Sequence, residues 1–204
     1  MARPIAADAT ATRQRILSAA GMAFSEKGRS GASIRSISSA AGVSLAMVHH
    51  YFGSKSGLYA ACLDAMYAEL APLRETMTTK LSEGGDFRSL IEYAIRTCFR
   101  FACSHQVPIR LLFRQITNRG ELDPGLRAQR QIPFLDNATT ALSIATGRES
   151  TSLRLPLQSA VMLIARYGIS SETELRTFTG ATTAKEATAL VENHLVSIIT
   201  AILQ

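Results

Sequence analysis

The chain has 204 residues, of which 47% are apolar and 19% charged, a composition typical of a globular protein and unlike that of a disordered one. No apolar run reaches about 18 residues and the first 15 residues lack the apolar stretch of a secretory signal, so we expect a cytoplasmic protein without a membrane span. The three cysteines, Cys62, Cys98 and Cys103, form no C-x-x-C pair, which argues against a disulfide framework and a cysteine zinc site.

The net charge of +6 is unevenly distributed along the chain. Residues 1–58 carry seven basic and two acidic side chains, a net charge of +5, whereas residues 59–204 carry 15 basic and 14 acidic side chains. A basic module next to a nearly neutral one is the pattern expected of a protein that binds a phosphate backbone. A basic surface also favours solubility, so charge alone leaves both interpretations open.

In the N-terminal third of the chain, the sequence pattern predicts a flexible arm at residues 1–11 followed by four helices. The first runs from about Thr12 to Gly28, with an apolar face that includes Ile16, Ala20 and Phe24. Serines are placed to cap the next three helices: Ser33 before residues 34–41, Ser44 before residues 45–52, and Ser54 before a long helix that Pro72 should kink or end. Between the two short helices, Gly42 breaks the chain and Val43 is expected to be a buried pivot.

Helical periodicity continues through the rest of the chain, so we predict an all-α fold. Gly84-Gly85 marks a break, and Asp86 can cap an amphipathic helix over residues 87–102. Proline and glycine delimit the helices that follow: Pro108 to Gly120, then Pro124 to Gly147 with a bend at Pro133. An apolar helix follows near residues 155–169, and a capping box of Thr183 and Glu186 opens the last helix, which ends near residue 203.

The last two long helices carry broad apolar stripes. We expect a second copy of the chain to cover them in an intermolecular four-helix bundle, with an intramolecular core as the alternative. The residues of this predicted dimer interface are Leu157, Val161, Ile164, Leu190, Val191, His194, Leu195, Ile198 and Ile202.

Residues 34–52 form a helix, a tight glycine turn and a second helix, which is the helix-turn-helix arrangement. At about 100° per residue, Val48 and Phe52 of the second helix face inward and Ala46 and His50 face outward. The consecutive His49 and His50 diverge by the same angle, so they are poorly placed to share one metal ion. No catalytic spacing or phosphate-binding glycine loop occurs. We therefore predict no metal, no cofactor and no enzymatic activity.

The outward face of the second helix suits the major groove of double-stranded DNA. Ala46 permits close approach and can meet a thymine methyl group, and His50 can bond to a base edge or a phosphate. His49, Tyr51 and Ser44 can bond to phosphate oxygens, and Lys55 begins a helix whose N-terminal end also favours phosphate. The predicted DNA-binding residues are Ser33, Arg35, Ser44, Leu45, Ala46, Met47, His49, His50, Tyr51 and Lys55.

The stretch "RILSAAGMAFSEKGRSGASIRSISSAAGVSLAMVHHYFGSKSGLY" resembles the DNA-binding domain of TetR-family transcriptional regulators. The resemblance rests on the long first helix, the "AGVS" turn, the aromatic- and histidine-rich helix that ends at Phe52, and the following Lys55 and Leu58. This sequence departs from the commonest family pattern at several positions: His49 stands where the family usually has tyrosine, and Gly57 where it usually has an acidic residue.

The resemblance implies a helix-turn-helix domain at residues 12–56 and a helical effector-binding and dimerisation domain at residues 57–204. It further implies a homodimer on a palindromic operator, and a small-molecule effector that releases it. Candidate residues for the effector pocket, each of which could equally be ordinary core, are Phe99, Cys103, Phe113, Ile116, Phe134, Met162, Arg166 and Tyr167.

Three functional hypotheses follow. The first is a repressor that a ligand releases from DNA, the second is an architectural DNA-binding protein without an effector, and the third is a small helical enzyme. The enzyme hypothesis needs a cluster of titratable groups, and the sequence offers none.

Overall fold

The computed structural model describes residues 5–82 and 86–203, and within these ranges all regular secondary structure is helical, which confirms the all-α prediction. The chain forms two compact units. The first combines the residues up to Leu70 with Val107–Gly120, and the second combines Ala71–Gln106 with the residues from Glu121 onward. The predicted domain boundary after residue 56 therefore differs from the division by contacts, in which the start of the fourth helix and a distant segment belong to the first unit.

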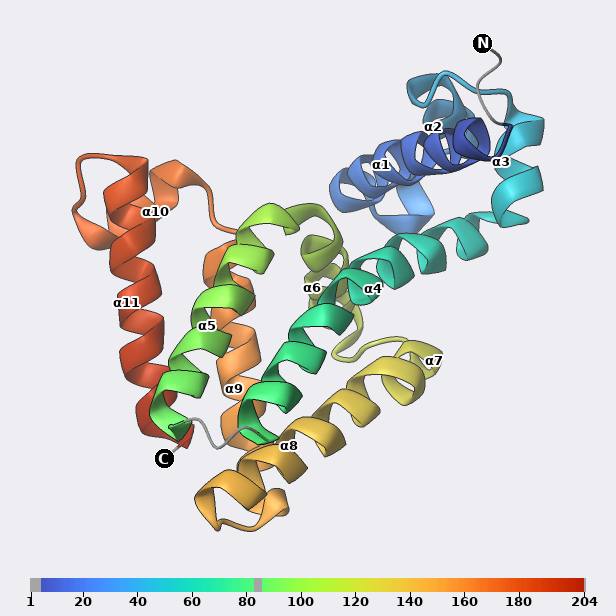
Figure 1. Cartoon of the computed structure of the whole chain (residues 1–204). Helices are drawn as coiled ribbons and strands as arrows, with labels where there is room; N and C mark the ends of the chain where they lie inside the picture. Colours follow the sequence, from blue (N-terminus) through green and yellow to red (C-terminus); the bar gives the residue numbers. More distant parts are fainter. Residues whose placement is uncertain (1–4, 83–85, 204) are drawn as a thin grey trace. The chain divides into compact units, whose positions relative to one another are not determined.

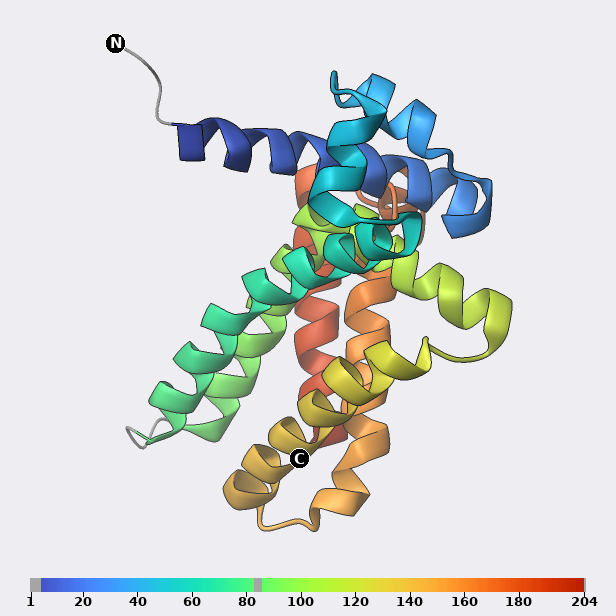
Figure 2. The ribbon, with the colours of Figure 1, turned by 90° about the vertical axis from the view of Figure 1, so that its right-hand side faces the viewer.

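The first unit contains α1 (Ile5–Gly31), α2 (Ile34–Ala40), α3 (Leu45–Phe52), the first part of α4 (Lys55–Ser82) and most of α6 (Gln106–Arg119). Figures 1 and 2 both show α2 and α3 beside α1. Its core includes large side chains from all five helices that are at most 2% exposed: Ile16, Phe24, Ile37, Val48, Leu58 and Leu111.

Helix α1 begins at Ile5, so it includes most of the segment that the sequence predicts to be an arm. The alanine-rich composition of that segment and the acidic Asp8 in the first turn both favour a helix. Gly28 interrupts the helix with φ 70° and ψ 170°, at the predicted end. Helix α4 continues through Pro72 to Ser82, so the alternative in which proline ends the helix is wrong. The break predicted at Gly84-Gly85 lies outside the described residues.

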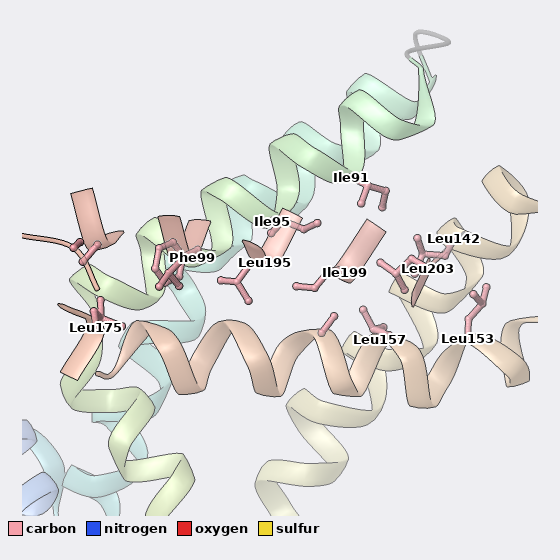
Figure 3. Packing of buried hydrophobic residues seen from close by; sticks show 14 residues of the cluster. Ile91, Ile95, Phe99, Leu142, Leu153, Leu157, Leu175, Leu195, Ile199 and Leu203 are labelled. Carbon is pink, nitrogen blue, oxygen red and sulfur yellow. The ribbon is translucent and has the colours of Figure 1, made fainter. Parts of the chain in front are cut away.

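The second unit is built from α5 (Phe87–Ser104), α9 (Ser150–Gly168) and α11 (Ala184–Leu203), which pack side by side (Figure 1). Helix α8 (Ile132–Thr146) packs on α9, preceded by the short α7 (Pro124–Leu126) and the π-helical turn η1 (Arg127–Gln131). Helix α10 (Glu172–Thr179), which the sequence analysis did not identify, packs on α11. The core of this unit gathers side chains from α5, α8, α9, α10 and α11 (Figure 3).

Most predicted helix caps are present in the second unit. The Asp86 carboxylate accepts a hydrogen bond from the Ser89 backbone N–H at 2.9 Å, and the Thr183 hydroxyl accepts one from the Glu186 N–H at 3.2 Å. The Glu186 carboxylate reaches back to the N–H of Thr182 at 3.1 Å, one residue before the predicted partner.

Helix α11 is the one helix of the described residues that is long and apolar enough to cross a membrane, with a mean hydropathy of 1.3. Its residues Val191, Leu195 and Ile199 lie in the core of the second unit, which is the usual place of such a helix in a globular protein.

Candidate nucleic-acid interface

The turn between α2 and α3 is closed by backbone hydrogen bonds and a serine cap. Gly42 has φ 64°, a left-handed conformation that glycine adopts at little cost. The N–H of Val43 donates to the Ser38 carbonyl at 3.0 Å, and the Ser44 hydroxyl accepts from the Met47 N–H at 3.2 Å, as predicted. Val43 itself is half-buried, so it is less enclosed than the buried pivot that the sequence suggested.

Helix α3 is oriented by one fully buried side chain and one half-buried aromatic ring. Val48 is 2% exposed, and Phe52 lies under the guanidinium of Arg13, whose Cζ is 5.4 Å from the ring centroid. A guanidinium over an aromatic face is a favourable cation–π contact. Arg13 on α1 therefore helps to fix the C-terminal end of α3. No local sequence pattern predicts this contact between Arg13 and Phe52.

The opposite face of α3 is exposed and carries no carboxylate. Ala46, His49 and His50 are exposed, and Leu45 and Met47 are 41% and 37% exposed. The ring of the half-buried Tyr51 meets that of His50 edge to face, with centroids 5.4 Å apart. The predicted division of the helix into an inward and an outward face is therefore present.

His49 is held at the end of α3 by a hydrogen bond to the turn that follows. Its Nδ1 lies 2.9 Å from the carbonyl oxygen of Gly53, and the Gly53 N–H in turn donates to the His49 carbonyl at 2.8 Å. Gly53 has φ 68°, a conformation that would strain most other residues. The imidazole is thus positioned by the backbone, with the ring exposed on the flank of α3.

The remaining predicted contact residues surround α3. Ser33 occupies the N-cap position of α2, but its side chain makes no capping hydrogen bond, and Arg35 is exposed. Lys55 is half-buried, and its Nζ donates to the Ser30 carbonyl at 2.9 Å. The ammonium group of Lys55 therefore already binds the last turn of α1, where the exposed carbonyls favour a positive charge.

Helix α6 also contacts the C-terminal part of α1. Arg114 donates to the carbonyls of Ser25 at 3.4 Å and Glu26 at 2.9 Å, next to the left-handed Gly28. A Cβ atom at Gly28 would lie 2.9 Å from Arg114 Nε, so the glycine also makes room for this contact. Sequence reasoning missed Arg114, because nothing near residue 114 indicates which distant carbonyls it will bind.

A second polar contact joins α6 to α4 within the first unit. The Gln115 amide donates to the Tyr59 hydroxyl at 2.8 Å, and the Tyr59 ring packs edge to face on Phe24 with centroids 5.2 Å apart. Burial raises the pKa of Tyr59, although the hydrogen bond from Gln115 opposes that shift. The tyrosine therefore stays protonated at neutral pH and serves as a structural link.

Residues 16–62 match the family described as "Bacterial regulatory proteins, tetR family". Over these residues the chain is similar to the tetR family. It is 34% identical over 125 residues to the HTH-type transcriptional regulatory protein RaaS of Mycobacterium tuberculosis, a match that spans 56% of this chain and 58% of RaaS. It is 27% identical over 106 residues to the "Probable HTH-type transcriptional regulator YttP" of Bacillus subtilis, over 52% of this chain and 51% of YttP. The chain thus spans somewhat more than half the length of these two curated relatives.

Solved structures of tetR-family proteins share the fold along almost the whole chain. A TetR-like transcriptional regulator from Rhodococcus sp. RHA1 superposes with a TM-score of 0.64 at 21% identity, covering 98% of both chains. The fatty acid degradation regulator FadR of Bacillus halodurans superposes with a TM-score of 0.58 at 13% identity, covering 90% of this chain and 97% of FadR. These likenesses concern the fold alone.

The residues predicted to line a tetR-type effector pocket fall into two separate groups. Phe113 and Ile116 lie on α6 in the first unit, and the other six lie in the second. There, Phe99 is fully buried in the core, Cys103 and Tyr167 pack against that core, and Met162 is half-buried. Phe134 is 48% exposed, and Arg166 is exposed and paired with Glu174 at 2.8 Å.

A shallow hollow of about 410 Å³ lies elsewhere, at the end of α10. It shares no residue with the predicted pocket, because its lining consists of Thr173, Arg176, Thr177, Gly180 and Ala181.

Three residues of the predicted dimer interface belong to the core of the chain itself. At most 8% of the surface of these three residues is exposed, and they lie in the core between α9 and α11, so they cannot face a partner: Leu157, Val191 and Leu195. Val161 and Ile164 also pack on this core. The predicted residues that remain accessible are Leu190 and His194, both exposed, and the half-buried Ile198 and Ile202.

Proposed function

We propose that this chain is a DNA-binding transcriptional regulator that reads double-stranded DNA with α3. The observation that carries the proposal is the serine-capped α3, buried through Val48 and exposed through Ala46 and His50, on a module with a net charge of +5 over residues 1–58. A helix of this shape, small at its centre and free of acidic groups, fits a major groove.

We assign base-edge contacts to the outward side of α3 and phosphate contacts to its flanks. Ala46 and His50 face the base edges, with Leu45 and Met47 beside them. Ser44, His49, Tyr51 and Lys55 bind phosphates, and Ser33 and Arg35 do so from the start of α2. Lys55 can take this role without leaving Ser30, because an ammonium group has three N–H donors and Ser30 uses one of them.

We further propose a homodimer that is formed by the exposed sides of α9 and α11. Leu155 on α9 is 79% exposed, and the half-buried Met162 lies two turns further along the same side. On α11 the exposed Leu190 and His194 and the half-buried Ile198 offer a matching stripe. Two such pairs of helices would form a four-helix bundle.

Sedimentation of the purified chain tests the dimer. We expect a mass of twice the 22.0 kDa of one chain, and a single-chain mass for Leu155→Glu. Ile144→Glu is the matched control, because Ile144 is 82% exposed on α8, outside the proposed interface. A monomeric wild-type chain, or an equal effect of both substitutions, would contradict the proposed interface.

The physiological activity that we propose is repression in the cytoplasm, relieved by a small molecule. A ligand weakens operator binding if it favours a conformation that DNA does not, which is a coupling free energy between two sites. Of the predicted pocket residues, Phe99 lies in the core of the second unit and Cys103 and Tyr167 pack against that core. We propose these three side chains as part of the pocket wall.

Selection of duplexes from a random-sequence pool by the full-length chain tests the proposed function. We expect enrichment of an inverted repeat whose half-sites are about one helical turn apart or a multiple of it. Failure to enrich any sequence would overturn the proposal that α3 reads DNA. Small molecules that weaken binding to the selected duplex would support the effector, and the lack of any would favour an architectural protein.

A further inference from the structure

The hydrogen bond between His49 and Gly53 fixes which ring nitrogen of His49 carries hydrogen. A carbonyl oxygen can only accept a hydrogen bond, so Nδ1, at 2.9 Å from the Gly53 oxygen, must be the donor. In the neutral imidazole the other nitrogen, Nε2, is then unprotonated and presents a lone pair. The imidazolium form carries hydrogen on both nitrogens and keeps the bond to Gly53.

A DNA phosphate distinguishes sharply between these two forms of His49. Phosphate oxygens are acceptors, and the lone pair on neutral Nε2 is an acceptor too, so the neutral ring cannot bond to a phosphate directly. The imidazolium can donate from Nε2 and adds a charge-assisted hydrogen bond. Tyrosine, which the family usually has at this position, donates through its hydroxyl group over the whole neutral range of pH.

We propose that His49 contacts a backbone phosphate only as the imidazolium, so that DNA binding takes up a proton at this residue. The inference rests on the proposed function, because it concerns the phosphate contact assigned to His49. It adds to the proposed function that the His49–phosphate contact depends on pH. Part of the affinity for DNA therefore depends on pH as well.

The neighbouring elements carry the cations Arg13 on α1, Arg35 on α2 and Lys55 on α4, and the acidic residues of α1 are Asp8 and Glu26. Neither α2, α3 nor the first turn of α4 contains an acidic residue. On α3 itself the titratable neighbours are His50 and Tyr51, whose rings contact each other. We take the phosphate as the counter-charge for a protonated His49, because α2, α3 and the first turn of α4 offer no carboxylate.

Two measurable consequences follow, both of definite sign. Each proton taken up on binding raises the association constant tenfold per unit fall in pH, over the range in which the histidine is protonated on DNA and neutral in the free chain; histidines ordinarily change charge between about pH 5 and 8. Affinity therefore rises as pH falls and then levels off. The imidazolium also adds one cation–phosphate contact per protomer, so the slope of log K against log[salt] steepens by about 0.9 per protomer at low pH.

The experiment uses the full-length chain and a duplex that it selects from a random-sequence pool at neutral pH. Affinity is measured from about pH 6 to about pH 8.5. Proton uptake is counted by calorimetry in two buffers of different ionisation enthalpy. The variants are His49→Tyr, which restores the usual donor of the family, and His105→Gln, a control on a histidine of the second unit to which no DNA contact is assigned.

For the wild-type chain and for His105→Gln we expect uptake of up to one proton per protomer, largest at the pH values at which His49 is protonated on DNA but neutral in the free chain. For His49→Tyr we expect no uptake. His49→Tyr should bind the duplex with a salt slope that does not change with pH. An affinity of the wild-type chain that is independent of pH, or proton uptake that survives in His49→Tyr or disappears in His105→Gln, would overturn the inference while leaving DNA binding intact. If no duplex is selected at all, the proposed function itself fails.

Discussion

Substitution of Gly168 by alanine tests how closely α9 and α5 pack in the core of the second unit. A Cβ atom built on Gly168 would lie 2.4 Å from the Cβ of Ala102 on α5, and 3.1 Å from the Ala102 carbonyl carbon. Carbon atoms in favourable contact are about 3.5–4.0 Å apart, so the added methyl group is more than about 1 Å too close. Its neighbours are a backbone atom and a Cβ atom, neither of which can rotate away, so the helices must separate.

Two opposing effects decide the magnitude of the change in stability. Inserting a methyl group into a packed core costs about 1–3 kcal/mol. Replacing glycine by alanine in a helix gains up to about 1 kcal/mol, and less at the last residue of α9. The net destabilisation should therefore be about 1–2 kcal/mol. In a chain of this length 1 kcal/mol corresponds to about 2–4 °C in Tm, so we expect Tm to fall by about 2–8 °C.

Urea and thermal unfolding, followed by circular dichroism, measure this change in a double-mutant cycle. Ala102→Gly removes the nearest clashing atom, so the double variant with Gly168→Ala should be more stable than the sum of the two single effects predicts. We expect a coupling energy of about 1–2 kcal/mol. A Gly168→Ala variant as stable as the wild type, or single effects that simply add, would refute the close packing of the two helices.

Three further outcomes are expected. Lys55→Ala should weaken binding to all DNA sequences and reduce the salt slope by about 0.9 per protomer; weaker binding at an unchanged slope would mean that Lys55 acts only through Ser30. Ala46→Glu should abolish DNA binding without changing the circular dichroism spectrum, because Ala46 is exposed. If this variant still bound the duplex, the outward face of α3 would be assigned wrongly. Burial raises the pKa of the Cys62 thiol from 9.0 to about 12. Above pH 9 the thiol therefore ionises in the unfolded chain but not in the folded one. This difference lowers the free energy of unfolding by about 1.4 kcal/mol per pH unit. Cys62→Ala should therefore lose stability less steeply between about pH 9 and about pH 11 in urea titrations, and equal slopes would contradict that prediction.

The local structure of the candidate site could be predicted from sequence because its determinants are local. The Ser44 hydroxyl caps an N–H three residues away, and Gly42 supplies the left-handed turn. The helical repeat alone places Val48 inside and Ala46 outside. Each of these features depends on residues within about one or two turns of helix, a distance over which sequence spacing fixes geometry.

Contacts between distant segments could not be predicted in the same way. Arg114 binds the carbonyls of Ser25 and Glu26, almost 90 positions earlier, and no feature of the sequence marks that pair. The apolar stripes of α9 and α11 were correctly located, but an apolar side chain is equally stable against its own chain or another. Leu157 and Leu195 therefore looked like interface residues and are core.

The contacts that Arg114 and Gln115 make with α1 and α4 have a consequence for protein engineering. An N-terminal fragment cut from this chain after Leu70 would lack the segment that binds the end of α1 and the Tyr59 hydroxyl. A hybrid protein that joins this fragment to the second unit of a relative should therefore carry residues 107–120 as a second insert. Hybrids without that insert are expected to melt earlier, so the number of exchanged segments becomes a design variable.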